Sequence, residues 1–394
     1  MRSRLRSLLL CLLLAATPAF SQPAPGAPVV VGAAMPQSGI LADLAADLRK
    51  ALLYWQEEVN AAGGLNGRHV ELLLLDDRSE SKDAGRLYEQ LIHEYKAELL
   101  IGPFGSAASL GAAAAAERNR RVLVNATGAS RVVQKPVLRY VFQVAAPLGS
   151  YSEGLLELAR SQGLKRLFLV ARDDPSSQEI AARMREDALK QGFVVGNVAV
   201  MSTNADEYAP QVALARAAGA EAWIAFGQPV DAFRMVRSFS RLRYAPKLFV
   251  AQGAAQPDFI TRVGQAAEYT VGVTPYDKRA RTRGNAEFVQ GYTKKWSAEP
   301  GAVAAEGYAA ARVLQEAVQR AGSLDQEKLR EALSALETET PIGPYKVDIA
   351  GIQLAARPLV VQIQRGRREI LWPEAYATQK LQPYPAWETR KPPK

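Results

Sequence analysis

The sequence has little of the side-chain chemistry on which common enzymes depend. One cysteine and two histidines occur among its 394 residues, and these are Cys11, His69 and His93. No G-x-S-x-G, H-E-x-x-H or Walker motif is present, and the turn at 32–39 lacks the G-x-G-x-x-G spacing of a dinucleotide site. We therefore expect a protein that is not an enzyme and that holds no metal and no cofactor.

Long apolar runs are scarce as well. The early run Leu8–Ala16 follows three arginines and precedes Ala19-Phe20-Ser21, a small-x-small cleavage site. No stretch reaches the roughly 18 uninterrupted apolar residues that a membrane span needs. We expect residues 1–21 to be a signal peptide that is cleaved near Ser21 and Gln22, so that the mature chain is periplasmic. Cys11 lies inside this signal after a leucine, and we expect neither a lipid anchor nor a disulfide.

Charge of one sign is in only modest excess. The formal net charge is +9, and removal of the three signal arginines leaves +6. The basic segments 278–283 and 365–368 lack interleaved aromatic residues, which favours solvated charged faces over a nucleic-acid site. A mature chain of about 370 residues exceeds the size at which one core usually keeps growing, so we expect two lobes.

Apolar residues recur at helical spacing in some segments and form short runs in others. Leu44, Leu48 and Leu52 share one helical face, and Gly63-Gly64 ends that helix before the strand 70–75. Further helices are expected at 83–95, 107–118, 151–163, 177–191, 209–218, 232–242, 283–296, 302–321 and 324–336, and strands at 29–34, 99–102, 122–125, 167–171, 194–201, 222–227, 247–251, 346–348 and 359–364. Each repeat returns the chain to the same sheet edge, so we expect two successive parallel α/β sheets with right-handed crossovers.

Small polar residues follow two neighbouring strands of the first series. Phe104-Gly105-Ser106 follows the strand 99–102, and the segment 125–130 after the next strand offers Thr127 and Ser130. Where a parallel strand leads into a helix, unpaired backbone N–H groups and hydroxyls can bind an anion. The alternative interpretation is that Ser106 and Ser130 only cap their helices.

Several segments together resemble one protein family. They are 32–39 (GAAMPQSG), 59–67 (VNAAGGLNG), 75–77 (LDD), 101–106 (IGPFGS) and the closing 372–378 (WPEAYAT). They are similar to the branched-chain amino acid and amide substrate-binding proteins of bacterial ABC transporters, over about residues 28–375.

The resemblance implies a fold and its boundaries. The fold is α/β, with two Rossmann-like lobes that carry parallel sheets and are joined by a three-crossover hinge, the type I periplasmic binding protein. The first lobe takes residues 28–145 and 276–356, the second takes 146–275 and 357–372, and 373–394 form a C-terminal tail. One small ligand is held between the lobes.

The resemblance also assigns residues in the first lobe. Ser106 matches the family serine that bonds the ligand carboxylate, and Phe104 matches the flanking residue that lines the pocket. Thr127 matches a position that presents backbone to the ligand. The next contact, usually a threonine, falls on Ala129, and Ser130 substitutes for it only if the loop shifts by one residue.

The matches to the rest of the pocket are poorer. Family tyrosines that line the pocket fall on Leu44, Ser176 and Gln228. The acidic residue that pairs with the ammonium group of an amino acid falls on Gly253. An unpaired buried ammonium costs on the order of 3 to 5 kcal/mol, so the loss has energetic weight.

Two explanations of the missing acid stay open. Either a neighbouring aspartate, Asp173, Asp174 or Asp231, supplies the charge, or the ligand has no ammonium group. Our hypothesis is that the ligand is a small apolar carboxylate or amide, with an amino acid as the alternative.

The function that the resemblance implies is capture and delivery. We expect an extracytoplasmic solute-binding protein, monomeric, that passes its ligand to an ABC permease in the inner membrane and binds no nucleic acid. The alternative is a ligand-sensing module that reports to a signalling partner.

Two further segments have competing interpretations. Asp76-Asp77 could be a turn or a metal or phosphoryl site, and 306–308 could be core or part of the cleft mouth.

Overall fold

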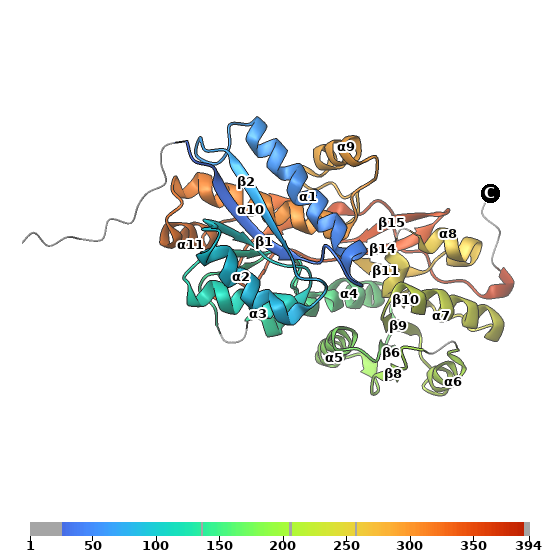
Figure 1. The fold of residues 1–394 in the computed structure, drawn as a ribbon. Coiled ribbons are helices and arrows are strands. Elements are labelled where there is room, and N and C mark those ends of the chain that lie inside the picture. Colours follow the sequence, from blue (N-terminus) through green and yellow to red (C-terminus); the bar gives the residue numbers. More distant parts are fainter. Residues whose placement is uncertain (1–25, 135–136, 205–206, 257, 390–394) are drawn as a thin grey trace, which may run out of the picture.

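The computed structural model describes residues 26–134, 137–204, 207–256 and 258–389, which form two α/β lobes around two separate sheets (Figure 1). The expected signal peptide at 1–21, its cleavage site, Cys11 and the last five residues of the tail lie outside these ranges. Within the described residues, no helix combines the length and the apolar character that a membrane crossing requires.

The first sheet has five parallel strands in the order β2-β1-β3-β4-β5. Its elements are β1 (Val29–Met35), α1 (Ala42–Ala61), β2 (Val70–Asp76), α2 (Ala84–His93), β3 (Leu99–Ile101), α3 (Ser106–Arg118), β4 (Leu123–Asn125) and β5 (Val141–Gln143). Helices α2 and α3 cover one face, where alanines of α3 pack in a buried cluster. A Cβ on Gly111 would come within 2.7 Å of the Gly85 backbone nitrogen, so these two helices approach at their glycines.

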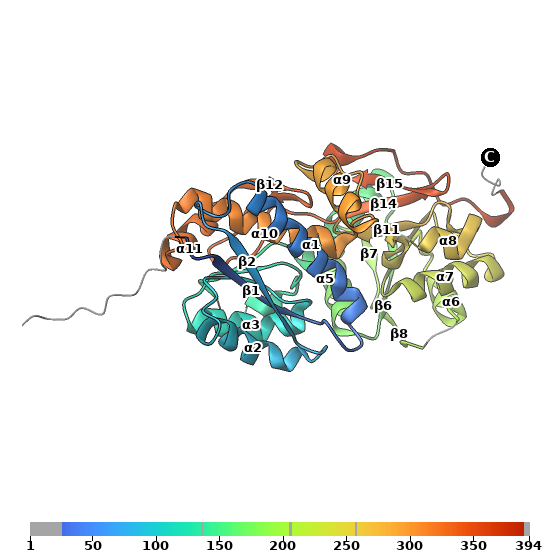
Figure 2. The same cartoon turned by 45° about the horizontal axis from the view of Figure 1, so that its top comes forward.

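The opposite face of the first sheet is covered by α1 and by helices from late in the sequence. These late elements are α9 (Asn285–Trp296), α10 (Ala302–Ala321), α11 (Gln326–Ser334) and the hairpin of β12 (Thr338–Thr340) and β13 (Gly343–Tyr345). Figure 2 shows α10 beside α1, and Trp55 Nε1 of α1 donates to Gln315 Oε1 of α10 at 2.9 Å. The first core therefore combines residues from both ends of the sequence.

The second sheet is mixed, with the order β15-β14-β11-β10-β9-β6-β7 and β8 paired to β6. Its elements are α4 (Glu153–Ser161), β6 (Arg166–Arg172), α5 (Pro175–Lys190), β7 (Val194–Val195), β8 (Ala199–Met201), α6 (Ala209–Ala217), β9 (Ala222–Phe226), α7 (Pro229–Leu242), β10 (Leu248–Ala251), α8 (Phe259–Val263), β11 (Val271–Thr274), β14 (Leu359–Gln364) and β15 (Arg367–Trp372). Strand β14 runs antiparallel to both β11 and β15.

Two strand predictions were wrong. The expected strand 194–201 is divided into β7 and β8, because the intervening residues begin with Gly196, whose lack of a side chain weakens a strand. The expected strand 346–348 is only an isolated bridge between Val347 and Gln353, since the paired strands β12 and β13 lie earlier. The antiparallel strand β15 was not expected, because its charged start, Arg367 to Glu369, hides the apolar end of the strand.

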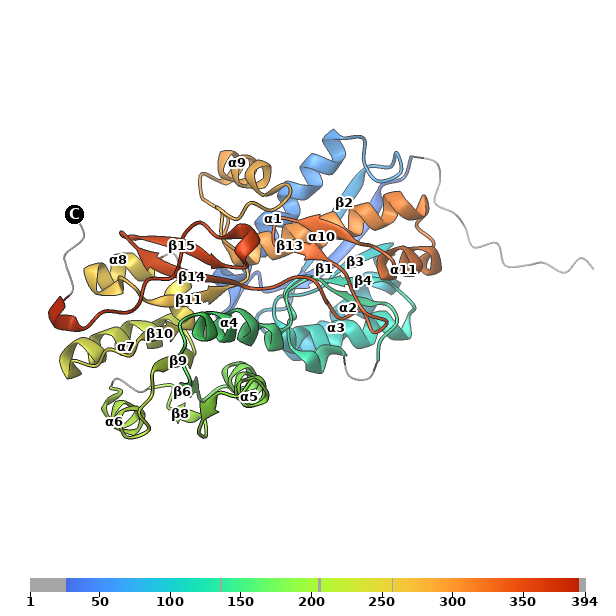
Figure 3. The ribbon, with the colours of Figure 1, turned by 180° about the vertical axis from the view of Figure 1, so that it is seen from behind.

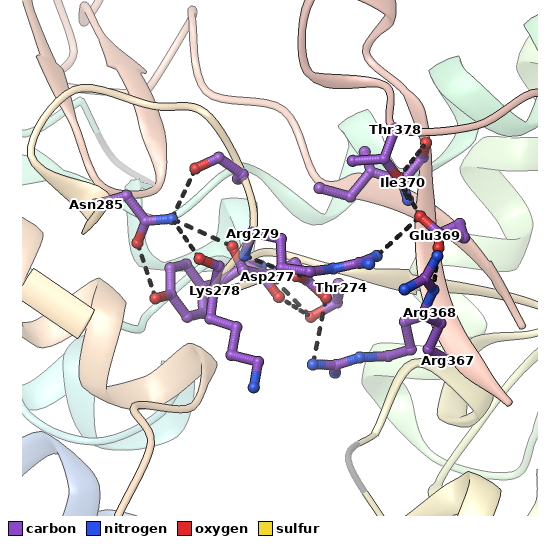
Figure 4. Close-up of polar contacts among 12 residues, drawn as sticks. Thr274, Asp277, Lys278, Arg279, Asn285, Arg367, Arg368, Glu369, Ile370 and Thr378 are labelled. Atoms are coloured by element: carbon purple, nitrogen blue, oxygen red, sulfur yellow. Dashed lines mark hydrogen bonds and ion pairs between the residues drawn. The ribbon is translucent and has the colours of Figure 1, made fainter. Parts of the chain in front are cut away.

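A buried ionic network holds the crossover from β11 to α9 against β15 (Figure 4). Asp277 is 1% exposed, and its Oδ2 lies 3.2 Å from Arg368 Nη2. Arg279 Nη2 in turn lies 3.2 Å from Glu369 Oε2. The crossover is therefore fixed to the second sheet just before the chain returns to the first core.

The chain after β15 packs along the second sheet as far as residue 389 (Figure 3). Tyr384 N donates to Lys247 O at 3.0 Å, and Trp387 Nε1 donates to Tyr244 O at 2.8 Å. Gln362 Nε2 of β14 donates to Gln382 O at 2.7 Å. The segment 373–389 therefore packs against the second lobe, whereas the sequence predicted only a C-terminal tail at 373–394.

Candidate functional site

Loops at the carboxyl ends of strands from both sheets meet in this structure. Ser130, after β4, donates from Oγ to Glu179 Oε2 of α5 at 2.8 Å. Beside it, Leu148 N donates to Ala129 O at 3.2 Å. Ligands of open parallel sheets bind outside the carboxyl ends of strands, so this is the place at which to look for a site.

Four of the residues predicted in the first lobe lie together there. Thr127 Oγ1 accepts a hydrogen bond from Gly105 N at 2.8 Å and donates to Pro103 O at 3.0 Å. Ser106 Oγ accepts from Ser130 N at 3.2 Å. The loops after β3 and β4 are thus tied into one unit, next to the first turn of α3.

The capping interpretation of Ser106 is wrong. Gly105 is the N-cap of α3, with a φ of 81° that favours glycine, and Ser106 is the first helical residue. The first backbone N–H groups of a helix have no partner within the helix, and no side chain of the described residues caps this one. Together with the Ser106 hydroxyl, they form a site that suits an anion. Phe104, partly buried, packs against the first core beside them.

The three residues predicted in the second lobe also come together. Ser176, Gln228 and Gly253 line one cavity of about 190 Å³. Other polar walls come from Asp174, Ser177, Gln252, Gln256 and Thr274, and apolar walls come from Leu148, Ile180, Pro229, Val273, Pro275 and Ala302. None of the first-lobe residues Phe104–Ser106 and Thr127–Ser130 lines this cavity, and Ala302 at the start of α10 is the contribution from the first-lobe side.

The structure explains why position 253 carries no acid. A Cβ on Gly253 would lie 2.6 Å from Pro229 Cα and 2.8 Å from Gln228 O, both of them backbone atoms. Gln228 and Pro229 begin α7, where Gln228 and Asp231 form a reciprocal capping box. An acidic side chain at 253 would therefore have to displace the start of this helix.

The three aspartates considered as substitutes are used within the lobe. Asp231 is fully buried, and Arg172 Nη1 lies 3.0 Å from each of its oxygens. Asp174 caps α5 by accepting from Ser177 N at 2.9 Å. Asp173 is exposed and accepts from Gln178 Nε2 at 2.8 Å. Of the three, only Asp174 lines the cavity.

Two other positions do not join the site. Leu44, onto which a family tyrosine falls, is 60% exposed on α1. Asp76 closes the turn after β1, because its Oδ1 accepts from Gln37 N at 2.8 Å. Burial opposes ionisation there, but hydrogen bonds from the Ser38 hydroxyl and three backbone N–H groups lower the pKa of Asp76 to about 2. Within the described ranges, no cluster of three or more His, Cys, Asp or Glu side chains is arranged to hold a metal ion.

Two carboxyl groups near the site were missed from the sequence. Glu179 contacts Ser130 from the other lobe. The sequence hinted at it only because Glu179 lies about one helical turn after Ser176. Glu306 is 8% exposed on α10, one turn after Ala302, and burial raises its pKa to about 8. Glu306 in turn adds to the rise in the pKa of Tyr151 that burial causes. The segment 306–308 had been noted, but carboxyl burial depends on tertiary packing.

The sequence model of the periplasmic binding protein family matches residues 28–368 of the chain. The chain belongs to this family.

Several relatives match this periplasmic binding protein over nearly its whole length. The Leu/Ile/Val-binding protein homolog 7 of Brucella abortus is 24% identical over 398 residues, which cover 95% of this chain and 98% of that protein. The structure of a putative branched-chain amino acid ABC transporter protein from Silicibacter pomeroyi has a TM-score of 0.83 at 19% identity and covers 91% of this chain and 100% of that chain. A solute-binding protein of Rhodopseudomonas palustris in complex with 3,4-dihydroxybenzoic acid has a TM-score of 0.73 at 20% identity, with coverage of 87% and 95%.

Two predictions are confirmed for this periplasmic binding protein. Its fold is the type I architecture of two α/β lobes, and its family is that of the Leu/Ile/Val-binding proteins of ABC transporters. The family is one of extracytoplasmic binding proteins rather than enzymes. The roles of individual residues stay predictions.

Proposed function

We propose that this periplasmic binding protein captures a small carboxylate or amide ligand between its lobes and delivers it to an ABC importer. The observation that carries the proposal is the joined pair of loops at the start of α3, where Thr127 and Ser130 bond to Gly105 and Ser106. Uncapped helix N–H groups beside a hydroxyl are suited to a ligand carboxylate.

The division into lobes follows the two cores. We propose that residues 28–145 and 276–356 move as one body, and that 146–275 and 357–372 move as the other. A ligand that contacts both bodies stabilises the closed arrangement only through its higher affinity for that state. The docked permease then opens the protein, and ATP is hydrolysed by another subunit.

The chemistry of the ligand follows from the groups at the carboxyl edges of the two sheets. The first edge is the loops after β3 and β4 with the start of α3, and the second edge is the loops and helix starts around the cavity of the second sheet. The first edge offers a hydroxyl and helix N–H groups, and the second offers a cavity with walls such as Leu148, Ile180 and Val273. A carboxylate at the first edge would leave a short apolar side chain for the cavity. Branched-chain amino acids and 3,4-dihydroxybenzoic acid, to which the names of the relatives refer, share a carboxylate.

The proposal also covers the setting of the protein. We propose export with cleavage near Ser21 and Gln22, a monomeric periplasmic form, and a permease in the inner membrane as partner. No catalysed reaction is part of it. Turnover of a bound ligand by the purified protein would contradict this point.

Ligand-induced thermal stabilisation tests the proposal. The mature protein is screened against branched-chain and aromatic amino acids, short amides, and aliphatic and aromatic carboxylates. A ligand at about 1,000 times its dissociation constant stabilises by roughly 4 kcal/mol, which shifts the melting temperature measurably. We expect Ser106→Ala to weaken binding at least about tenfold, because it removes a hydrogen bond to a charged group.

The control for this experiment is Ser334→Ala, at an exposed serine of α11 that bonds only to its own helix. It should bind as the unchanged protein does. If no compound of the screen shifts the melting temperature, or if Ser106→Ala and Ser334→Ala bind equally well, the proposed site is wrong.

A further inference from the structure

We propose that Glu179 is a specificity-determining residue, whose carboxylate is the counter-charge that the cleft offers to a cationic group on the ligand. The inference rests on the proposed function and adds to it the charge of the ligand. It starts from the hydrogen bond between Ser130 Oγ and Glu179 Oε2, 2.8 Å long, which joins the carboxylate-binding loop of one lobe to α5 of the other.

The place of Glu179 suits contact with a ligand in the cleft. Its carboxylate reaches the loop that also carries Thr127, and its neighbour Ile180 lines the second-lobe cavity. Leu148, another wall of that cavity, donates its backbone N–H to Ala129 of the same loop. The carboxylate therefore contacts the loop of the proposed carboxylate site, and the helical turn that carries it borders the proposed side-chain cavity.

Glu179 differs from its neighbours on α5 in lacking a cationic partner. Asp187 accepts from Arg183 Nε at 2.9 Å, and Glu186 is paired with Lys190. Among the residues that the structure describes, no lysine, arginine or histidine forms an ion pair with Glu179, which is partly buried. A partly buried carboxylate with one hydroxyl as partner gains from a cation placed beside it.

The other second-edge positions considered for an acid cannot offer one to a ligand in the same way. Asp231 is held by Arg172, Asp174 caps its own helix, and Gly253 has no room for a side chain. Among these second-edge positions, Glu179 is thus the acid that remains for a ligand, while Glu306 is buried on α10 in the first lobe.

The arrangement of charge then selects between ligands. A ligand carboxylate at the start of α3 comes close to Glu179, and two like charges at short range disfavour each other. A ligand with an ammonium group on the carbon next to its carboxylate places a positive charge between them. A carboxylate that lacks the amino group does not, so we infer that the cleft selects α-amino acids over their des-amino analogues.

Ser130 acquires a different role from the one carried over by resemblance. Its single hydroxyl proton is donated to Glu179 and is not available for the ligand carboxylate at the same time. Ser130 therefore positions Glu179, and the carboxylate is left to Ser106 and the helix N–H groups.

Calorimetric dissociation constants for matched ligand pairs test the inference. The pairs are leucine with 4-methylpentanoate and phenylalanine with 3-phenylpropanoate, which differ only in the amino group. The variants are Glu179→Gln, which keeps the shape without the charge, and Glu186→Gln, which removes an exposed charge two turns further along the same helix. We expect the unchanged protein to prefer the amino acid of a pair at least about tenfold, and Glu179→Gln to abolish that preference by weakening the amino acid.

Each other outcome has a distinct meaning. If Glu179→Gln weakens both members of a pair equally, Glu179 is only a contact between the lobes and the inference is wrong. It is also wrong if the unchanged protein prefers the des-amino acid. If binding depends on Ser106 but not on Glu179, the proposed function stands without the inference. If no pair binds, the inference is wrong, and the wider thermal-shift screen decides the proposed function separately. Glu186→Gln should behave as the unchanged protein, and a general loss in both variants would point to the charge of α5 as a whole.

Discussion

The two sheet edges that meet in this protein use polar groups in different ways. At the first edge, neutral hydroxyls bond to backbone, as Thr127 does with Gly105 and Pro103. At the second edge, charges are paired inside the lobe, with Asp231 buried against Arg172. Under the proposed function, the first edge keeps unpaired donors for a ligand, whereas the fixed charges of the second edge hold its own loops in place.

The two kinds of interaction also differ in what their removal costs. A neutral hydrogen bond contributes about 1 kcal/mol to stability, because water replaces the lost partner. Removal of one member of a buried ion pair costs about 3–5 kcal/mol, because the other charge stays buried without a partner. Mutations at the two edges should therefore differ in size in a predictable order.

The largest effect is expected at the buried pair of the second edge. Arg172→Met removes the guanidinium and leaves Asp231, which is fully buried, without its cation. We expect the free energy of unfolding to fall by about 3–5 kcal/mol, measured by urea denaturation followed by circular dichroism.

A double variant and a surface control sharpen this result. Arg172→Met combined with Asp231→Asn should recover most of the loss, because no charge is left buried and the asparagine oxygen can still accept from Gln228 N. Arg118→Met removes a pair with Glu89 in which the arginine side chain is 61% exposed, and it should cost less than about 1 kcal/mol. Equal losses for Arg172→Met and Arg118→Met would contradict the contrast between the edges.

A smaller, pH-dependent effect is expected where α10 approaches the second lobe. Burial raises the pKa of Glu306 from 4.5 to about 8. The folded state therefore holds one proton more than the unfolded state between these values, so stability is highest at low pH and falls as the pH rises through 8. Between about pH 6 and about pH 8 this loss amounts to about 2 kcal/mol.

Glu306→Gln has no proton to lose and should lack this fall. Unfolding free energies of the two proteins, measured by urea denaturation at both pH values, give the difference directly. Glu287→Gln, at an exposed carboxyl of α9, should keep the fall of the unchanged protein. If Glu306→Gln and the unchanged protein lose stability in parallel, Glu306 is ionised at lower pH than its burial implies.

Much of the fold could be predicted because it depends on local pattern. Helical periodicity identified α1, and apolar runs identified strands such as β1 and β9, since each element buries a face that its own residues define. The short strands β5 and β11 carry too few residues for such a pattern, and their pairing depends on neighbours distant in sequence.

The candidate site was predicted in part for a similar reason. Strand ends predicted that Ser106 and Thr127 lie at the same sheet edge, and the structure joins their two loops there, because parallel strands bring their carboxyl ends to one edge. The pairs Arg172 with Asp231 and Ser130 with Glu179 join residues that no spacing rule connects. The lack of space at Gly253 depends on the start of α7, which packs against it only in the folded chain.

The smallest effect is expected from Thr127→Val at the first edge. Valine has nearly the shape of threonine but can neither accept from Gly105 N nor donate to Pro103 O. We expect a loss of about 1–2 kcal/mol in unfolding free energy, because two neutral hydrogen bonds are removed from a partly buried place. Thr127→Ser keeps the hydroxyl and should retain most of the stability and the ligand affinity. A loss as large as that of Arg172→Met would mean that the first edge depends on its hydroxyls as strongly as the second depends on its charges, and the two edges would not differ as we infer.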